Sequence, residues 1–243
     1  MKPVFYDLHI HSCLSPCGDN DMTPNNILNM ALLKELDLIA LTDHNSCKNC
    51  PAILRAAEGS GLMVLPGMEL TTAEEIHVVC LFPALENAMD FDAHVHEKLL
   101  DVPNDPKIFG EQLILDERDE QVGTEEKLLV GATTIEISDA PALVRRFGGL
   151  CYPAHIDRNS YSVLSNLGFL PPECGFTALE VYRPEAFFAD GRHSDLKEGY
   201  DIITSSDAHY LEDIAERERC IHLETVDFAG LAERLEHRGP WRR

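Results

Sequence analysis

Residues that commonly bind metal ions stand at the C-terminal ends of several apolar stretches of this chain. Histidine, aspartate or glutamate closes five such stretches, which cover 4–11, 36–44, 62–70, 149–155 and 200–209. Only 11 of the 243 residues are histidine, so chance does not explain the pattern well. In barrels and open α/β sheets, ligands and chemistry collect at the carboxyl ends of the strands. The sequence therefore predicts a polynuclear metal centre assembled from several strands.

Two of the stretches end in pairs of candidate ligands that stand two residues apart. His9 and His11 form the first pair, and Asp207 and His209 form the second. Side chains two apart on a regular strand share a face, so each pair is able to chelate one ion. On the same reasoning, Asp7 is predicted to accept the ring N–H that a metal-bound histidine still donates.

A further pair with the same spacing, His94 and His96, has a different setting. Apolar residues recur at helical intervals through the surrounding segment, 85–101. On a helix, residues two apart point in roughly opposite directions and cannot close on one ion. These two histidines are predicted to lie on the surface of a helix.

Helical patterns alternate with apolar strands along the rest of the chain. Thr23 is predicted to cap the first helix with Pro24 in its first turn, and Ser138 or Asp139 to cap a later one. The predicted helices cover 24–35, 51–60, 140–147 and 227–238, and the remaining strands cover 76–82, 177–183 and 219–224. This alternation is typical of parallel strands joined by helical crossovers.

Residues 84–136 interrupt the alternation. They contain the polar helix of His94 and His96, a proline-containing link and a hairpin with its turn near 118–120. The segment is predicted to be an insertion or lid within a single domain that spans 1–243.

Composition narrows the class of protein. With 44% hydrophobic residues, a chain of 243 residues can form one sizeable core. No apolar run is long enough to cross a membrane, and the N-terminus lacks the features of a secretion signal. We therefore expect a cytoplasmic protein with no membrane partner, in which the eight cysteines are mostly reduced thiols. The oligomeric state stays open.

The chain is strongly acidic, with a formal net charge of −22 from 20 Lys and Arg against 42 Asp and Glu. Such a surface repels a polyanion at long range, and no cluster of basic residues offers a groove for a phosphate backbone. The charge therefore argues against long nucleic acid as a substrate. A small anion drawn to a locally cationic centre remains compatible with it.

Five motifs occur along the chain in the order DLHIHSCLSP, ALTDHNS, GMELTT, PAHIDR and SSDAHY. Together they resemble the ordered motifs of the PHP (polymerase and histidinol phosphatase) family, which are metal-dependent phosphoesterases on a distorted (β/α)7 barrel. The resemblance covers residues 5–210. It implies an α/β fold of this type, with an inserted helix and hairpin.

The resemblance also implies a set of ligands for two to three divalent transition metals. The set is His9, His11, Asp19, His44, Glu69, His77, His155, Asp207 and His209. It implies a first ion on His9, His11, Glu69 and Asp207, a second on Glu69, His77 and His155, and a third on Asp19, His44 and His209. Mixed imidazole and carboxylate ligands suit Zn, Mn or Fe. The loop ligand after the first motif falls in SPCGDND, where Asp19 is preferred and Asp21 and Cys17 are alternatives.

The predicted function is hydrolysis of a small phosphomonoester by a metal-activated water in a trinuclear site. Arg158 and Arg183 are the candidate phosphate-binding residues. Asp43 points away from His44 on a regular strand, and is predicted to support the site as a loop cap or as a partner of a ligand. The alternatives are a nucleotide phosphatase or short-oligonucleotide exonuclease of the same fold, a non-catalytic metal-binding module, or a hydrolase of another bond class.

Two cysteine pairs follow the first two candidate ligand strands. Cys13 and Cys17 are four residues apart, and Cys47 and Cys50 form a C-x-x-C pair. Four thiols on neighbouring loops could form a separate metal site or a redox-sensitive pair, but plain reduced cysteines are the preferred interpretation.

Overall fold

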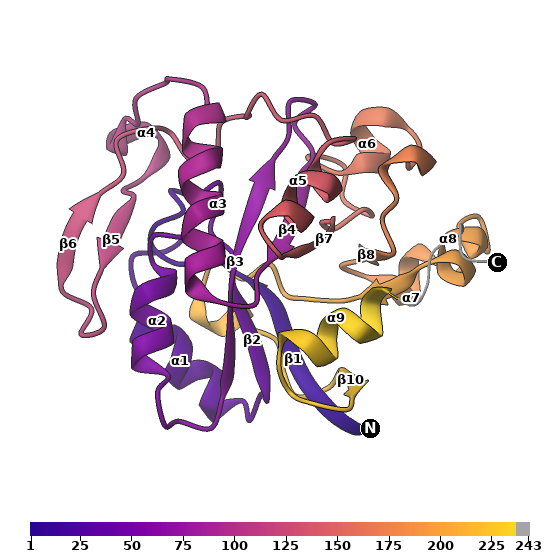
Figure 1. Ribbon diagram of the computed structural model, residues 1–243, viewed down its shortest axis with the longest axis horizontal. Coiled ribbons are helices and arrows are strands. Elements are labelled where there is room, and N and C mark those ends of the chain that lie inside the picture. The colour runs from indigo at the N-terminus through magenta and orange to yellow at the C-terminus, as the bar shows by residue number, and fades with distance from the viewer. Residues whose placement is uncertain (237–243) are drawn as a thin grey trace.

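The computed structural model describes residues 1–236 and shows a curled sheet flanked by helices (Figure 1). The strands of the main sheet, in order across it, are β10 (Cys220–Leu223), β1 (Lys2–Ile10), β2 (Leu38–Leu41), β3 (Met63–Thr71), β4 (His77–Leu81) and β7 (Leu150–Pro153). Two smaller pairs are β5 (Leu113–Leu115) with β6 (Gln121–Thr124), and β8 (Ala178–Glu180) with β9 (Asp201–Ile203).

The helices lie between these strands in the chain. They are α1 (Pro24–Leu33), α2 (Cys50–Ala56), α3 (Leu85–Lys98), α4 (Pro106–Phe109), α5 (Ala140–Arg146), α6 (Val163–Leu167), α7 (Pro184–Phe187), α8 (Ser194–Gly199) and α9 (Phe228–Glu236). Short 3-10 helices cover Pro172–Cys174 and Leu211–Asp213. No helix among the described residues is both long enough and apolar enough to span a membrane.

The helix starts follow the predicted capping in part. The side chain of Thr23 accepts a hydrogen bond from the N–H of Asn26 at 3.3 Å, and Pro24 stands in the first turn of α1. Asp139 precedes α5 but makes no capping hydrogen bond through its side chain. The short helices α4, α6, α7 and α8 were not predicted, because four to six residues are too few to show a helical period.

The sheet closes into a distorted barrel through β8 and β9. The N–H of Ile156, just after β7, donates to the carbonyl of Glu180 at 2.9 Å. Ala208, just after β9, pairs in parallel with Ile10 at the end of β1. The resulting ring of β1, β2, β3, β4, β7, β8 and β9 confirms the predicted α/β barrel fold.

The strands are not all parallel, which corrects the expectation from their alternation with helices. β4 pairs antiparallel with both β3 and β7. The chain reverses between β3 and β4 in a turn where the N–H of Thr72 donates to the carbonyl of Ile76 at 2.9 Å. Such a short connection cannot make a parallel crossover. The reversal places His77, the first residue of β4, opposite Thr71 at the end of β3.

Two groups of apolar side chains cover the two faces of the sheet. In β2, Leu38 and Ala40 belong to the group inside the barrel, while Ile39 and Leu41 belong to the group under the outer helices. Successive strand residues point to opposite faces, so a strand buried on both faces reads as a continuous apolar run. This is why the strand sequences resemble one another.

Helix α9 closes one end of the barrel interior. Leu231 and Leu235 pack in the interior group with Val4, near the start of β1, and Figure 1 shows α9 beside β1 and β10. His9 lies near the other end of β1, so α9 and the candidate ligands occupy opposite ends of the barrel. The predicted final helix is present, and its last two predicted positions, 237–238, lie outside the described residues.

The segment 84–136 leaves the barrel after β4 and contains α3, α4 and the predicted hairpin β5–β6. Figure 1 shows this hairpin at the outer edge of the molecule. The N–H of Leu113 donates to the carbonyl of Cys13 at 3.0 Å, and the side chain of Asn49 donates to the carbonyl of Leu113 at 3.1 Å. The hairpin is therefore fixed to loops that follow β1 and β2, which supports its interpretation as an insertion over the ligand end of the barrel.

We predict that Leu231→Ala lowers the free energy of unfolding by about 2–5 kcal/mol, because it leaves a cavity in the barrel interior. Leu231 is fully buried, whereas Leu33 is 76% exposed and serves as the control. Leu33→Ala should change stability by less than about 0.5 kcal/mol. Denaturant unfolding of both variants checks this, and similar losses would show that α9 does not close the core.

Candidate metal centre

Glu69 is the point at which the candidate ligands meet. Its side chain is 1% exposed and lies in the last part of β3. Five histidine rings approach its carboxylate oxygens, with nitrogen–oxygen distances of 3.2 Å for His9, 3.3 Å for His11, 2.9 Å for His44, 2.8 Å for His77 and 3.1 Å for His155. Closure of the barrel thus brings together predicted ligands that are far apart in the sequence.

A register irregularity in β1 aims its two histidines at this point. The pairing of β1 with β2 shifts between Asp7 and Ile10, and such irregularities turn side chains to a new face. The Nε2 atoms of His9 and His11 lie 3.2 Å apart. Asp7 faces elsewhere and accepts hydrogen bonds from the N–H and hydroxyl of Ser206 at 3.0 and 2.6 Å. The prediction that Asp7 holds a ligand histidine is wrong because it assumed a regular strand.

Glu180, which the sequence analysis missed, takes the role predicted for Asp7. Both of its carboxylate oxygens lie 3.1 Å from Nδ1 of His9, and one accepts the backbone N–H of His155 at 3.1 Å. A carboxylate only accepts, so Nδ1 of His9 carries the proton and Nε2 keeps its lone pair for a metal ion. The signal that could have identified Glu180 is an acidic residue inside the apolar run 177–183.

Asp43 fixes the ring of His11 through Ser15. The Ser15 hydroxyl donates to Asp43 at 2.7 Å, and Asp43 also accepts the backbone N–H of Ser12 at 2.7 Å. The only proton of the Ser15 hydroxyl is used in this way, so its oxygen accepts Nδ1–H of His11 at 2.9 Å. Nε2 of His11 is thereby left free to bind a cation. Asp43 therefore acts on His11 through Ser15, as a positioning residue.

Three groups of ligand atoms are close enough together to hold a metal ion. They are His9, His11, Glu69 and Asp207; His44, Glu69 and His77; and His11, His44 and His209. Nδ1 of His44 and Oε2 of Glu69 are buried without a hydrogen-bond partner within residues 1–236, although they lie 2.9 Å apart. Buried polar atoms normally have partners. Facing lone pairs of imidazole and carboxylate therefore fit a shared cation, and this donor set suits Zn, Mn or Fe.

The grouping differs in part from the one that the resemblance implied. The first group contains the four residues expected for the first ion, whereas His44 joins Glu69 and His77 in the second. His155 reaches Glu69, and its Nδ1 has no partner among the described residues.

Two of the candidate ligands have an unusual backbone conformation. His155 and Asp207 have φ values of 30° and 53°, a left-handed conformation that costs energy and often marks functional sites.

The carboxylates and imidazoles shift one another's pKa values. Burial raises the pKa of Glu69, but His77 and His9 hold it well below its ordinary value. Burial lowers the pKa of His9, but Glu180 and the other carboxylates raise it well above its ordinary value. Burial lowers the pKa of His77 to about 4 against the opposing effect of Glu69. Without metal the centre thus keeps Glu69 ionised and His77 neutral, whereas His9 holds a proton that a metal ion would have to displace.

The loop after β1 brings Cys17 to the third group in place of Asp19. The sulfur of Cys17 lies 3.1 Å from Nε2 of His209. The carboxylate of Asp19 instead accepts the backbone N–H of Asp21 at 2.8 Å, and Asp21 is exposed. Burial acts to raise the pKa of Cys17, but His44 and His209 lower it to about 5. The preferred loop candidate is therefore not among the ligand atoms that the fold assembles.

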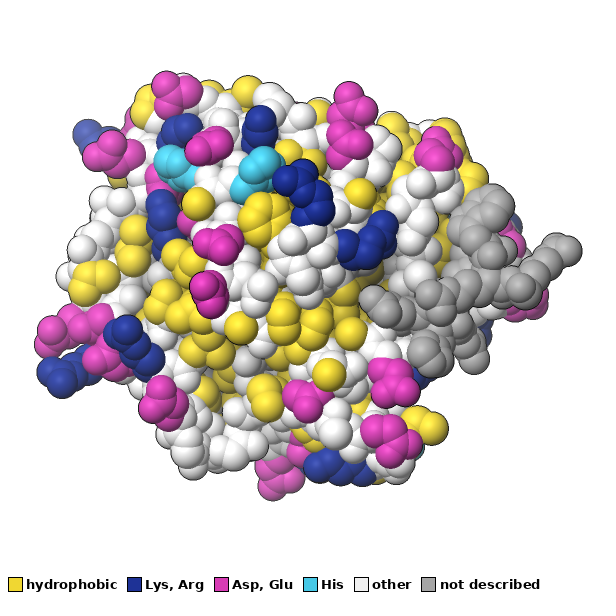
Figure 2. Space-filling view, in the orientation of Figure 1, with side chains coloured by type: hydrophobic (Ala, Val, Ile, Leu, Met, Phe, Trp, Pro, Cys, Tyr) yellow, Lys and Arg dark blue, Asp and Glu magenta, His cyan; other side chains and the backbone are white. Residues whose placement is uncertain are grey.

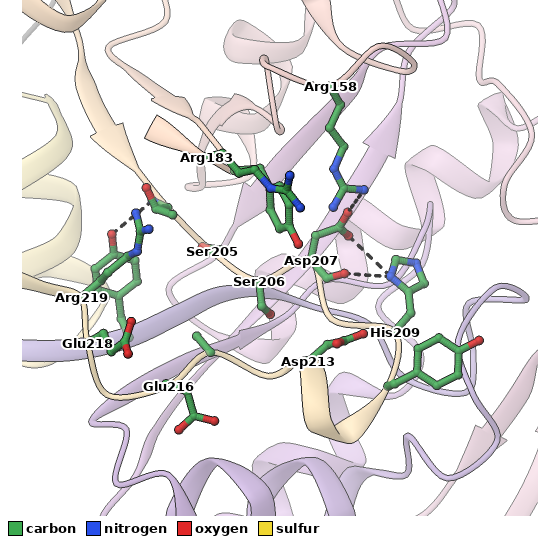
Figure 3. Close-up of a pocket in the computed structure, with 15 residues that line it drawn as sticks. Arg158, Arg183, Ser205, Ser206, Asp207, His209, Asp213, Glu216, Glu218 and Arg219 are labelled. Atoms are coloured by element: carbon green, nitrogen blue, oxygen red, sulfur yellow. Dashed lines mark hydrogen bonds and ion pairs between the residues drawn. The ribbon is translucent and has the colours of Figure 1, made fainter. Parts of the chain in front are cut away.

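A cavity of about 560 Å³ opens beside Asp207 and His209 (Figure 3). A guanidinium nitrogen of Arg158 lies 2.8 Å from the Asp207 carboxylate. The guanidinium carbons of Arg158 and Arg183 lie 4.6 and 5.4 Å from the ring centre of Tyr182. The structure therefore brings the two predicted phosphate-binding arginines together at the metal end of the cavity.

Arg219, which the sequence analysis did not identify, also lines this cavity. Figure 3 places Arg219 on the opposite side of the cavity from His209, with Glu218 next to it and Glu216 below. The cavity thus has arginine at both ends, with carboxylates beside each of them. Arg219 follows a stretch of charged residues, where no pattern separates it from an ordinary surface arginine.

The second His-x-His pair lies on α3, as predicted. Nε2 of His96 is 3.3 Å from Glu125, and the ring of His94 lies beside Phe147. Figure 2 shows histidines on the surface over α3, among acidic and basic side chains. Neither residue belongs to a group of metal-ligand atoms.

The four cysteines of the two loops do not form a common site among the described residues. Cys47 and Cys50 are buried, and their sulfurs lie 3.1 and 3.7 Å from the carbonyl oxygen of Gly67. Cys13 is also buried, and burial raises its pKa to about 12. Of the four, only Cys17 contacts a candidate ligand.

Comparison with known proteins gives partial matches in sequence. The family model of the PHP domain matches residues 7–136. A 5′-3′ exoribonuclease, Rnm, of Salmonella typhimurium is 35% identical over 83 residues, which are 32% of this chain and 27% of that protein. The uncharacterised protein MJ1587 of Methanocaldococcus jannaschii is 33% identical over 76 residues, which are 28% of this chain and 44% of that protein. These matches therefore span less than half of either relative.

Solved structures match nearly the whole chain. Endonuclease Q of Pyrococcus furiosus superposes with a TM-score of 0.68 and 17% identity, over 97% of this chain and 56% of that one. A candidate metal-dependent phosphoesterase of Bifidobacterium adolescentis has a TM-score of 0.59 and 19% identity, over 94% of both chains. At these identities the likeness concerns the fold, and it agrees with the barrel described above.

The exclusion of long nucleic acid on the basis of charge is wrong. One relative is an exoribonuclease, and endonuclease Q has been solved with a 27-mer duplex that carries an abasic lesion. The net charge of −22 describes the whole surface, whereas the potential at a cavity depends on the groups that line it. Here those groups are three arginines, Arg158, Arg183 and Arg219, and four carboxylates, Asp207, Asp213, Glu216 and Glu218.

We predict that Glu180→Gln weakens metal binding by about 10- to 100-fold, because an amide holds the ring of His9 less firmly than a carboxylate does. Competition with a chromophoric chelator measures the affinity. Glu224→Gln is the matched control, since the side chain of Glu224 is 65% exposed and contacts the N-terminal amino group. Unchanged affinity in Glu180→Gln, or an equal loss in both variants, would contradict the role given to Glu180.

Proposed function

Because the chain belongs to the PHP domain family, we propose that it is a metal-dependent phosphoesterase that cleaves phosphodiester bonds at the end of a nucleic-acid strand. The observation that carries the proposal is the cavity with arginines at both ends, directly beside Asp207 and His209. The exoribonuclease relative supports the same class of substrate. This proposal replaces the small phosphomonoester expected from the sequence.

The centre around Glu69 is proposed to hold two to three divalent ions, Zn, Mn or Fe. When bound, such ions supply Lewis-acid charge to the phosphate and lower the pKa of the attacking water. The protein prepares the ligands for them: Glu180 and Ser15 accept the Nδ1 protons of His9 and His11, which leaves both Nε2 atoms free. Fixed rings lose little freedom on binding, so the ions find a preformed site.

Arg158 is placed to bind a phosphate oxygen at the metal end. Its guanidinium contacts Asp207 at 2.8 Å and stacks on Tyr182, and its side chain is 38% exposed. One edge is therefore fixed by the carboxylate while the rest faces the cavity. Charge-assisted contacts from such a fixed guanidinium suit the non-bridging oxygens of a phosphodiester. Arg183 flanks the same tyrosine and offers a second donor.

Arg219 favours a substrate with more than one phosphate. A phosphomonoester bound at the metal end has no group for a guanidinium at the opposite side of the cavity. A volume of about 560 Å³ lies within the usual range for sites that enclose a small molecule or one unit of a polymer. Glu216 and Glu218 line the same side of the cavity as Arg219, so that side suits a single phosphate at Arg219 and repels a run of phosphates along the two carboxylates. The charges therefore favour entry of a strand by its end.

The proposal is tested with single-stranded RNA and DNA oligonucleotides labelled at either end, alongside mononucleotides and simple phosphomonoesters, under identical metal loading. We expect stepwise shortening from one end, which a gel resolves nucleotide by nucleotide. Turnover of phosphomonoesters alone would contradict the proposal. Random internal cleavage would contradict entry by the strand end.

We predict that Arg219→Ala raises KM for oligonucleotides and leaves kcat/KM for a simple phosphomonoester unchanged. Loss of one charge-assisted contact corresponds to about 1.5–3 kcal/mol, or roughly a 10- to 150-fold effect on kcat/KM. Arg55→Ala, on the far helix α2 and 66% exposed, is the control and should affect neither substrate. Equal effects of Arg219→Ala on both substrates would show that Arg219 does not bind a second phosphate.

A further inference from the structure

A sulfur atom lies beside the third group of ligand atoms, which consists of His11, His44 and His209. Nε2 of His209 lies 3.1 Å from the sulfur of Cys17. The ligand atoms of His44 and His209 already converge with that of His11. The sulfur of Cys17 thus lies beside three histidine ligand atoms that are already close enough together to hold a metal ion.

The proton of His209 is on the nitrogen away from the sulfur. Nδ1 of His209 lies 2.9 Å from the backbone carbonyl of Asp207, which can only accept a hydrogen bond. Nε2 therefore presents a lone pair toward Cys17. An imidazole lone pair and a sulfur at this distance share either the thiol proton or a metal ion, and thiolate and imidazole are both usual zinc ligands.

The loop is built to present Cys17 and to turn Asp19 away. The N–H of Gly18 donates to the carbonyl of Ser15 at 2.8 Å, and the N–H of Asp19 donates to the carbonyl of His209 at 2.9 Å. A side chain at Gly18 would meet the carbonyl oxygen of Ser12 at 2.5 Å, so this tight turn requires glycine. The backbone bond to His209 holds the loop beside that histidine, and the exposed Cys17 contacts its ring through the sulfur.

We propose that the thiolate of Cys17 is a ligand of the ion bound by His44 and His209, in the place that the sequence assigned to Asp19. The inference rests on the metal centre of the proposed function. A thiolate is a softer ligand than a carboxylate. This one position therefore prefers Zn or Fe over Mn, while the positions around Glu69 keep their imidazole and carboxylate shells.

Cobalt substitution tests the proposal without reference to activity. Co(II) bound to a thiolate gives an intense charge-transfer absorption in the near ultraviolet, which imidazole and carboxylate ligands do not give. The protein loaded with Co(II) should show this band. Cys17→Ser should lose the band and bind one equivalent fewer, and Cys17→Asp should recover the lost equivalent without the band.

Two control variants complete the design. Asp19→Asn should keep both the band and the number of bound equivalents. Cys220→Ser, which changes an exposed cysteine on β10, should behave like the unaltered protein. Thermal unfolding of the metal-free variants establishes that each one folds.

The possible failures are distinct from one another. A band that persists in Cys17→Ser, or a loss of one equivalent in Asp19→Asn with none in Cys17→Ser, overturns the assignment of Cys17. Cobalt binding without any thiolate band in the unaltered protein also overturns it, while leaving the proposed function intact. Failure of the unaltered protein to bind cobalt, zinc or manganese overturns both.

Discussion

The burial of one carboxylate among five histidines is the interaction on which the rest of this structure depends. Glu69 is 1% exposed, and an ionised carboxylate removed from water costs several kcal/mol unless opposite charge compensates it. The surrounding imidazoles provide that compensation when they are protonated, and metal cations provide it when the rings are neutral. The arrangement is therefore stable only as a complete set. Removing β1, β2, β4 or β7 would take away at least one of the histidines around Glu69.

Departures from regular strand geometry serve this convergence. The irregularity in β1 turns His9 and His11 toward Glu69, and the reversal between β3 and β4 brings His77 to the same end of the barrel. The left-handed backbone conformation of His155, just after β7, is a third such departure. The opposite end of the barrel is an ordinary apolar core closed by α9. The apolar core that stabilises the fold and the candidate metal ligands thus lie at opposite ends of the barrel.

The sequence was informative where chemistry and periodicity coincide. The ends of the apolar strands identified His9, His44, Glu69 and Asp207, because a metal centre needs such residues on neighbouring strands. The sequence did not predict the side-chain contacts that depend on tertiary geometry. Asp7 was given the role of Glu180 since a register irregularity leaves no mark in the residue pattern.

The loop ligand was misjudged for a similar reason. A carboxylate is the more familiar partner of histidine at such a centre, and the loop of thirteen residues between β1 and α1 allows either Asp19 or Cys17 to reach it. In the folded loop the sulfur of Cys17 contacts His209, whereas the carboxylate of Asp19 accepts the N–H of Asp21. The substrate class was also misjudged. It was inferred from the net charge of −22, which does not reveal that Arg158, Arg183 and Arg219 line one cavity.

Anomalous X-ray scattering from crystals grown with zinc or manganese tests the central claim most directly. The account predicts difference peaks at the absorption edge of the metal within bonding distance of the Glu69 carboxylate, with the Nε2 atoms of His9 and His11 in the same coordination shell. A well-ordered Glu69 held only by hydrogen bonds from protonated histidines, with no anomalous peak beside it at saturating metal, would contradict the account.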